Sequence, residues 1–153
     1  PRAPRMDDEQ PINPDPLYAR DQGYRFRGYY LGELDTPTFM YSSGSVEVED
    51  VSRIVQIEDR TVLRRELHLV APASETLHMR ILTGAIEEHS PTSFQTDELR
   101  ISVSTGEAVL RSGQMDPEQE GEHPNGDASL ELLLKLSLTE GTTTLILDYE
   151  LLR

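Results

Sequence analysis

The sequence predicts an all-β fold, an antiparallel two-sheet β-sandwich of about nine strands that follows an extended N-terminal arm. Apolar residues recur at every second position in successive short runs. Turn-forming residues separate these runs at intervals of roughly 8 to 12 residues, and no stretch of about ten residues has the period of a helix. We expect residues 1–22 to form the arm and residues 23–153 the sandwich domain. A closed barrel is the alternative that the pattern leaves open.

The segment 1–22 is rich in proline and charged residues. It contains five prolines and almost no apolar periodicity, so it can neither continue a helix nor join a central strand. We expect an extended arm that is held in place either by a partner surface or by the flank of its own domain.

Aromatic and basic side chains alternate in the first run of the sandwich domain. The alternation predicts two faces, Tyr24, Phe26, Gly28 and Tyr30 on one and Arg25, Arg27 and Tyr29 on the other. A turn at residues 32–35 leads into a partner strand at residues 38–41. An aromatic hairpin is therefore expected.

The middle of the chain continues the same pattern. Strands are predicted at residues 46–48, 54–57, 61–70, 77–81, 99–103 and 108–110. Residues 87–90 are interpreted as a loop. Residues 113–127 are rich in turn formers and lack a core-forming pattern, which predicts a long exposed loop.

The last two strands have the most regular pattern in the chain. Leucines occupy alternate positions from 130 to 138, and apolar residues alternate again from 145 to 151. These rows predict a hairpin whose leucines pack inward. Leu133 and Leu152 face the side opposite their rows, so we expect part of the outer surface to be apolar and covered.

The chain is strongly acidic. Its 28 acidic and 14 basic residues give a net charge of -14. This charge repels nucleic acid and anionic lipid surfaces, and it would steer in a basic protein partner. The alternative interpretation is that the charge only keeps the protein soluble.

Composition also excludes several chemistries. Because the chain contains no cysteine, it has no disulfide, no thiolate nucleophile, no cysteine zinc site and no CxxCH haem attachment motif. No run of about 18 consecutive apolar residues is present, so no transmembrane segment is expected.

Candidate metal and catalytic groups lack the spacing of known sites. The carboxylates at 113–127 could surround calcium, but a solvated acidic loop is the simpler interpretation. His68 and His78 fall on consecutive predicted strands, where a hairpin could bring them together, yet a pair of surface histidines is again simpler. Glu87 to Ser90 contains hydrolytic residue types without a nucleophile motif. We expect no catalytic residue, no metal, no cofactor and no enzymatic activity.

The best candidates for binding lie near the start of the sandwich domain and in the arm. Amphipathic rings and planar guanidinium groups are typical of protein interfaces. We expect Arg25, Arg27 and Tyr29, together with Leu17 and Tyr18 of the arm, to bind a protein partner. Packing within the hairpin explains the inward half of the aromatic residues equally well, and a sugar ring could stack on the same surface.

Three runs are familiar as a unit: GYRFRGYYL at 23–31, PTFMY at 37–41 and VEVED at 46–50. They resemble a β-rich accessory domain that accompanies c-type cytochrome and sugar-dehydrogenase-like domains in large extracytoplasmic bacterial proteins. The resemblance is confined to residues 23–50. Because the chain has neither a CxxCH motif nor propeller repeats, the resemblance carries over no haem and no dehydrogenase activity.

What the resemblance implies is a non-catalytic, extracytoplasmic subunit, periplasmic in location, that works beside redox proteins. Such a subunit would dock onto a larger membrane-associated electron-transfer complex that contains cytochrome, and a photosynthetic reaction-centre complex is one host of this kind. The alternative is a carbohydrate or small-ligand binding module that uses the same aromatic surface.

Overall fold

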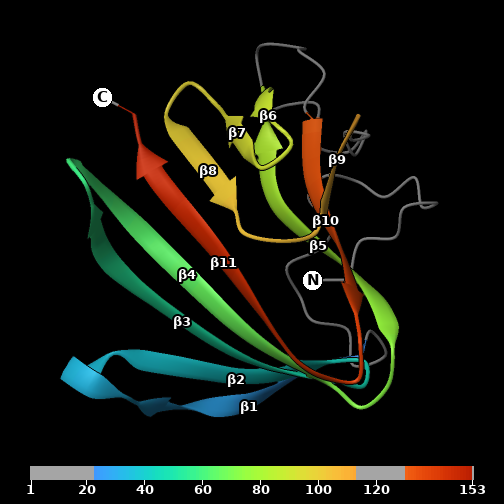
Figure 1. Ribbon diagram of the computed structural model, residues 1–153. Helices are drawn as coiled ribbons and strands as arrows, with labels where there is room; N and C mark the ends of the chain where they lie inside the picture. The colour runs from blue at the N-terminus through green and yellow to red at the C-terminus, as the bar shows by residue number, and fades with distance from the viewer. Residues whose placement is uncertain (1–22, 113–129, 153) are drawn as a thin grey trace, which may run out of the picture.

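Figure 1 shows the computed structural model, which describes residues 23–112 and 130–152. As predicted, the described residues form an all-β structure with two antiparallel sheets. They contain eleven strands, so the expected number of about nine is too low. The residues at 87–90, interpreted as a loop from the sequence, form a strand that pairs with the next short segment of the chain.

The larger sheet has eight strands in the order β1-β2-β3-β4-β11-β8-β7-β6. Their bounds are β1 (Tyr24–Leu31), β2 (Pro37–Ser43), β3 (Val46–Ile57), β4 (Arg60–Ala71), β11 (Gly141–Leu151), β8 (Leu99–Val103), β7 (Ser93–Gln95) and β6 (Glu87–Ser90). The smaller sheet contains β5 (Glu75–Gly84), β10 (Leu130–Leu138) and β9 (Glu107–Ser112), with β10 in the centre. A 3-10 turn, η1 (Glu33–Asp35), joins β1 to β2 where the sequence predicts a turn.

Among the described residues the chain passes between the two sheets four times, once from β5 to the edge strand β6 and three times at neighbouring corners. Strand β4 leads into β5, β8 into β9, and β10 into β11, so the neighbours β4, β11 and β8 in the large sheet match β5, β10 and β9 in the small one. In Figure 1 the two layers diverge from the β4/β5 and β10/β11 corners. The three strands of the small sheet therefore follow the same order as the three strands of the large sheet to which the corners connect them.

The core lies between the two sheets and is built largely from the predicted leucine rows. Leu132, Leu134, Leu136 and Leu138 of β10 pack with Leu145 and Leu147 of β11, and none of the six is more than 3% exposed. Each fully buried leucine contributes about 2 kcal/mol of hydrophobic free energy. The prediction of inward packing is confirmed for these six leucines, whereas Leu151 at the end of the second row is 77% exposed. The predicted hairpin of the two rows is wrong, because β10 and β11 turn through a corner into different sheets.

Within the described ranges, no helix is both long enough and apolar enough to cross a membrane.

Candidate partner-binding surface

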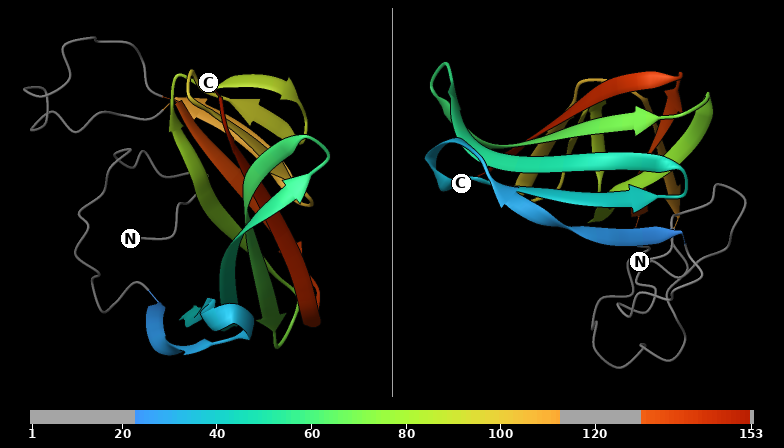
Figure 2. Two further views of the ribbon diagram at one scale, coloured as in Figure 1. Left: turned by 90° about the vertical axis from the view of Figure 1, so that its left-hand side faces the viewer. Right: turned by 90° about the horizontal axis from the view of Figure 1, so that it is seen from below.

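One end of the large sheet extends beyond the small sheet. In the right-hand view of Figure 2, strands β1 to β4 lie side by side and project past the second layer. The projecting part, which we call the wing, comprises residues 26–40 of β1 and β2 with their connection and residues 49–66 of β3 and β4 with theirs. The inner face of the wing continues the face of the large sheet that carries the core.

A β-bulge in β1 decides which aromatic and basic residues share a face of the wing. The register of β1 against β2 shifts at Arg27, which has no partner in the ladder. Beyond this point Tyr29 pairs with Phe39, and their ring centroids are 6.1 Å apart. Phe39 in turn pairs with Asp50 on the inner face, whereas Arg27 forms an ion pair with Glu47 on the outer face. The predicted common face of Arg27 and Tyr29 is therefore absent, because one inserted residue reverses the alternation.

The inner face of the wing exposes six large apolar side chains. Their exposed fractions range from 44% for Phe39 to 74% for Ile54. The strand pairing brings them to one face, since Tyr29 lies opposite Phe39 and Ile54 lies opposite Leu63. We call this set the inner apolar patch; it consists of Phe26, Tyr29, Leu31, Phe39, Ile54 and Leu63. Large exposed apolar side chains gathered on one face mark interaction sites on soluble proteins.

A partly buried ion pair lies beside Phe39 at the inner apolar patch. The Nε of Arg65 donates to the two carboxylate oxygens of Asp50 at 3.0 and 3.1 Å, and the Tyr41 hydroxyl donates to the same carboxylate at 3.2 Å. Asp50 is 8% exposed. The carboxylate therefore joins β2, β3 and β4 through charge-assisted hydrogen bonds.

The same environment perturbs the proton affinity of three side chains. Burial, followed by the charge of Asp50, raises the pKa of Tyr41 above its usual value, and burial likewise raises the pKa of Tyr149. Burial disfavours the charged form of Arg65, but hydrogen bonds and charge from Asp50 outweigh this effect, so the pKa of Arg65 is raised. At neutral pH the arginine is thus charged and both tyrosines are protonated.

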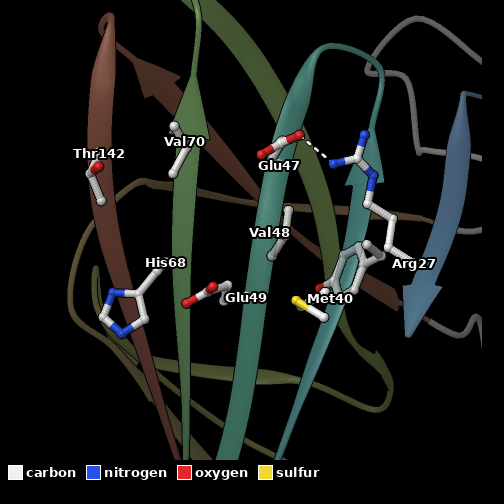
Figure 3. Close-up of a pocket in the computed structure, with 9 residues that line it drawn as sticks. Arg27, Met40, Glu47, Val48, Glu49, His68, Val70 and Thr142 are labelled. Carbon is white, nitrogen blue, oxygen red and sulfur yellow. Dashed lines mark hydrogen bonds and ion pairs between the residues drawn. The ribbon is translucent and has the colours of Figure 1, made fainter. Parts of the chain in front are cut away.

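The outer face of the same strands carries an acidic groove with a volume of about 420 Å³. Figure 3 shows its lining residues, which include Arg27, Met40, Glu47, Glu49, His68, Val70 and Thr142. Arg27 is paired with Glu47 at the rim. The Nε2 atom of His68 lies 3.2 Å from Oε1 of Glu66. Arg27 and Glu47 balance each other in charge, so the carboxylate of Glu49 gives the groove a net negative charge.

Several ion pairs lie on the outer face of the large sheet. Arg64 donates two hydrogen bonds of 2.8 Å to Asp148, which is a bidentate arrangement. Further pairs are Arg53–Glu66, Arg60–Glu150 and Arg100–Glu150, with N···O distances of 2.7, 3.2 and 3.5 Å. The charged side chains of the outer face are thus paired with one another, in contrast to the inner apolar patch.

The structure separates the predicted partner-binding residues. Arg25 is exposed in β1, Arg27 belongs to the acidic groove and Tyr29 belongs to the inner apolar patch. Leu17 and Tyr18 lie outside the described residues.

Sequence reasoning missed the ion pair and every member of the patch except Tyr29. Asp50 and Arg65 occupy positions of β3 and β4 where the alternation calls for apolar side chains, and these two charged residues in phase with the core are a signal that could have revealed the pair. Ile54 and Leu63 fall in predicted strands, and the alternation does not show that they are left 74% and 46% exposed.

The described residues assemble no metal centre, since no three His, Asp or Glu side chains within 23–112 and 130–152 are grouped to hold an ion. The hairpin that could have brought His68 and His78 together does not form. Their strands β4 and β5 belong to different sheets, where His68 pairs with Glu49 and His78 pairs with Lys135. The acidic segment 113–127, the candidate calcium loop, lies outside the described residues.

Comparison of the sequence with models of known protein families finds no match, and comparison with curated proteins finds no significantly similar chain.

Proposed function

We propose that the protein is a non-catalytic docking subunit that binds a protein partner through the inner apolar patch. The observation that carries the proposal is the exposure of six large apolar side chains, at 44% or more, on a face continuous with the core. A soluble domain gains no stability by exposing such a surface, whereas burial against a partner removes it from water. Tyr29 and Phe39 are the candidate anchors because aromatic side chains dominate the energetics of many interfaces.

Binding through the face of the wing is favoured over addition of a partner strand to the sheet edge. The two edge strands of the large sheet are β1 and β6, and each contains a bulge. Strand β1 also carries Arg25 and Arg27. Bulges and charged side chains are features that oppose edge-to-edge pairing. A partner therefore meets side chains of the patch and not the backbone of β1.

The net charge of -14 suggests a partner with a basic rim around an apolar centre. The two-sheet, sandwich-like fold serves as a rigid scaffold for the wing. The resemblance of residues 23–50 to accessory domains beside cytochromes suggests the setting, an extracytoplasmic, periplasmic assembly for electron transfer. In that setting the subunit contributes binding and no redox chemistry.

Site-specific photo-crosslinking in cells tests this function. A photoreactive phenylalanine analogue replaces Tyr29 or Phe39 of the inner apolar patch in two full-length variants. In a third, it replaces Val70, which is 43% exposed on the outer face of the same sheet and serves as the matched control. We expect one discrete protein adduct from each patch position and none from the control. Equal adducts from both faces, or none from the patch, would contradict docking through this surface.

Carbohydrate binding is the second candidate function, favoured by the position of the Tyr29–Phe39 ring pair beside the Asp50–Arg65 ion pair. Sugars are commonly bound by an aromatic ring that stacks on the pyranose face and by polar groups that bond its hydroxyls. A glycan array distinguishes the two functions. Docking to a protein predicts no glycan signal, whereas a signal that disappears in Tyr29→Ala would favour the sugar.

A further inference from the structure

The turn at the free end of the wing presents a leucine to solvent. This turn, η1 (Glu33–Asp35), joins β1 to β2, and Figure 1 shows the connection at the far left end of the hairpin. Leu34 is 98% exposed, more than any other large apolar residue of the described chain. Its side chain therefore contributes almost nothing to the packing of the fold.

The backbone at Leu34 has a conformation that leucine does not favour. Its φ is 56° and its ψ is 34°, and Asp35 follows with a φ of 55°. In this left-handed region the Cβ atom of an L-residue crowds the backbone carbonyl oxygen, so glycine, asparagine and aspartate are its usual occupants. Two backbone hydrogen bonds hold the turn closed, from the Gly32 amide to the Thr36 carbonyl at 2.8 Å and from the Thr36 amide to the Glu33 carbonyl at 3.2 Å.

The combination of strain and exposure at Leu34 is what calls for an explanation. Single exposed apolar residues are common on soluble proteins, and backbone strain persists where surrounding contacts compensate it. The side chain of Leu34 makes almost no such contacts, because nearly all of the residue lies in solvent. A glycine would form the same turn without the strain. The leucine side chain is therefore better explained by an interaction outside this fold.

We propose that Leu34 is an anchor that enters an apolar pocket of the protein partner, and that basic side chains surround this pocket. The proposal rests on the docking function proposed above and adds a contact residue and a feature of the partner. The turn is continuous with the inner apolar patch, because Leu31 of the patch pairs with Pro37 at the base of the turn. Glu33 and Asp35 are both exposed beside Leu34, and their carboxylates complement a basic rim.

A protein pocket is favoured over a lipid surface. One leucine buries too little apolar area to hold a protein at a membrane. Anionic headgroups would also repel the carboxylates that flank Leu34 and the net charge of -14. A closed turn suits a pocket, in contrast, because a side chain on a preformed backbone loses little conformational freedom when it binds.

Photo-crosslinking from the turn supplies the partner and keeps the two proposals apart. A photoreactive phenylalanine analogue replaces Leu34 in the full-length chain, and position 70 is again the control. We expect one discrete adduct from position 34, of the same protein that Tyr29 captures. Mass spectrometry of this adduct should place the crosslink in an apolar pocket bordered by lysine or arginine side chains.

The pattern of adducts assigns each failure to one proposal. An adduct from Tyr29 without one from position 34 would overturn the role of Leu34 and leave docking through the inner apolar patch intact. An adduct from position 34 without one from Tyr29 or Phe39 would contradict docking through the patch and leave Leu34 as the contact. Crosslinks scattered over the surface of the partner would overturn the pocket.

Two substitutions at position 34 separate the side chain from the turn. Leu34→Gly removes the side chain and relieves the strain at positive φ. We expect its thermal unfolding midpoint to stay unchanged or rise, while its affinity for the captured protein falls about tenfold or more. Leu34→Met keeps a large apolar side chain on the same backbone and should bind within about threefold of the unaltered chain. Titration calorimetry measures both affinities.

Glu58→Gly is the matched control for the change of backbone. Glu58 is exposed in the turn between β3 and β4 and has a φ of 53°. Its replacement should likewise not lower the unfolding midpoint, and the affinity should change by less than about threefold.

Several results would overturn the anchoring role of Leu34. These are an unchanged affinity or a lowered unfolding midpoint in Leu34→Gly, an equal loss of affinity in Glu58→Gly, and a loss in Leu34→Met as large as that in Leu34→Gly. Cosedimentation of the unaltered chain with phosphatidylcholine vesicles, if abolished by Leu34→Gly, would assign the leucine to a membrane and contradict the protein pocket.

Discussion

Asp50 and Arg65 show how one polar pair can replace apolar packing on an inward-facing row. Both side chains lie in phase with the core residues of their strands, and both are paired through several hydrogen bonds. Removing one member of such a pair leaves the other charge partly buried without a partner, whereas replacing both by apolar residues removes the desolvation cost as well. Each residue of the pair therefore stabilises the folded protein only while the other is present.

We predict that Asp50→Ala lowers the free energy of unfolding by about 3 kcal/mol, and that Asp50→Leu combined with Arg65→Met recovers most of this loss. Arg53→Ala is the matched control, because Arg53 forms a single exposed ion pair with Glu66 and its loss should cost less than about 1 kcal/mol. Urea unfolding measures all three values. Similar losses for Asp50→Ala and Arg53→Ala would mean that burial of the pair has no energetic consequence.

The tyrosines beside this pair predict a loss of stability in alkaline solution. Because the pKa of Tyr41 is raised in the folded state, the folded protein keeps its proton at pH values where the unfolded chain, with a pKa near 10.0, has lost it. The resulting stability is fully present below about pH 10 and declines as the pH rises further. Tyr41→Phe should reduce the slope of unfolding free energy against pH between pH 10 and 11 by up to about 1.4 kcal/mol per pH unit. Urea unfolding at successive pH values checks this, and an unchanged slope would show that Tyr41 ionises equally in both states.

At the scale of elements, the alternating pattern predicted the existence and phase of most strands, but not their assembly. The leucine rows of β10 and β11 were predictable because burial on one face leaves a period of two in the sequence. The bulge at Arg27 was not, because alternation of residue types continues through it while the pairing register shifts. Alternation also cannot show that β4 and β5 turn into different sheets, so the sequence left open a hairpin that would bring His68 and His78 together.

Two glycines lie at corners that join the sheets, where the alternation of apolar and polar residues gives no sign of their role. Gly106 lies at the β8/β9 corner with φ 102°, and a Cβ atom there would be 2.8 Å from Cδ1 of Leu134. Gly141 lies at the β10/β11 corner with φ 112°, but a Cβ atom there would meet nothing within 4 Å. A side chain at either position would therefore strain the backbone, but only one at position 106 would also collide with Leu134 of the core.

We predict that Gly106→Ala destabilises the protein by about 2 kcal/mol more than Gly141→Ala, because only the first adds overpacking of the core to the cost of a positive φ. Thermal unfolding of the two variants measures the difference. Equal losses would indicate that Leu134 moves aside freely and that the corner is looser than the contact implies.

At the scale of the whole molecule, the wing is the part of the large sheet that the second layer leaves uncovered. It exposes the inner apolar patch on one face and Leu34 at its free end. The candidate site was only partly predictable. Tyr29 was identified from residue type, but its combination with Ile54 and Leu63 arises because the small sheet does not extend over the wing. The relative extent of two packed layers leaves no local signature in the sequence.

The affinity of the partner identified by crosslinking, measured by titration calorimetry, tests docking through the inner apolar patch most directly. Tyr29→Ala and Phe39→Ala should each weaken binding by about tenfold or more, as expected for central aromatic anchors. Val70→Ala on the opposite face should change the affinity by less than about twofold. Unchanged affinity in both patch variants, with folding intact, would contradict the proposed role of this surface.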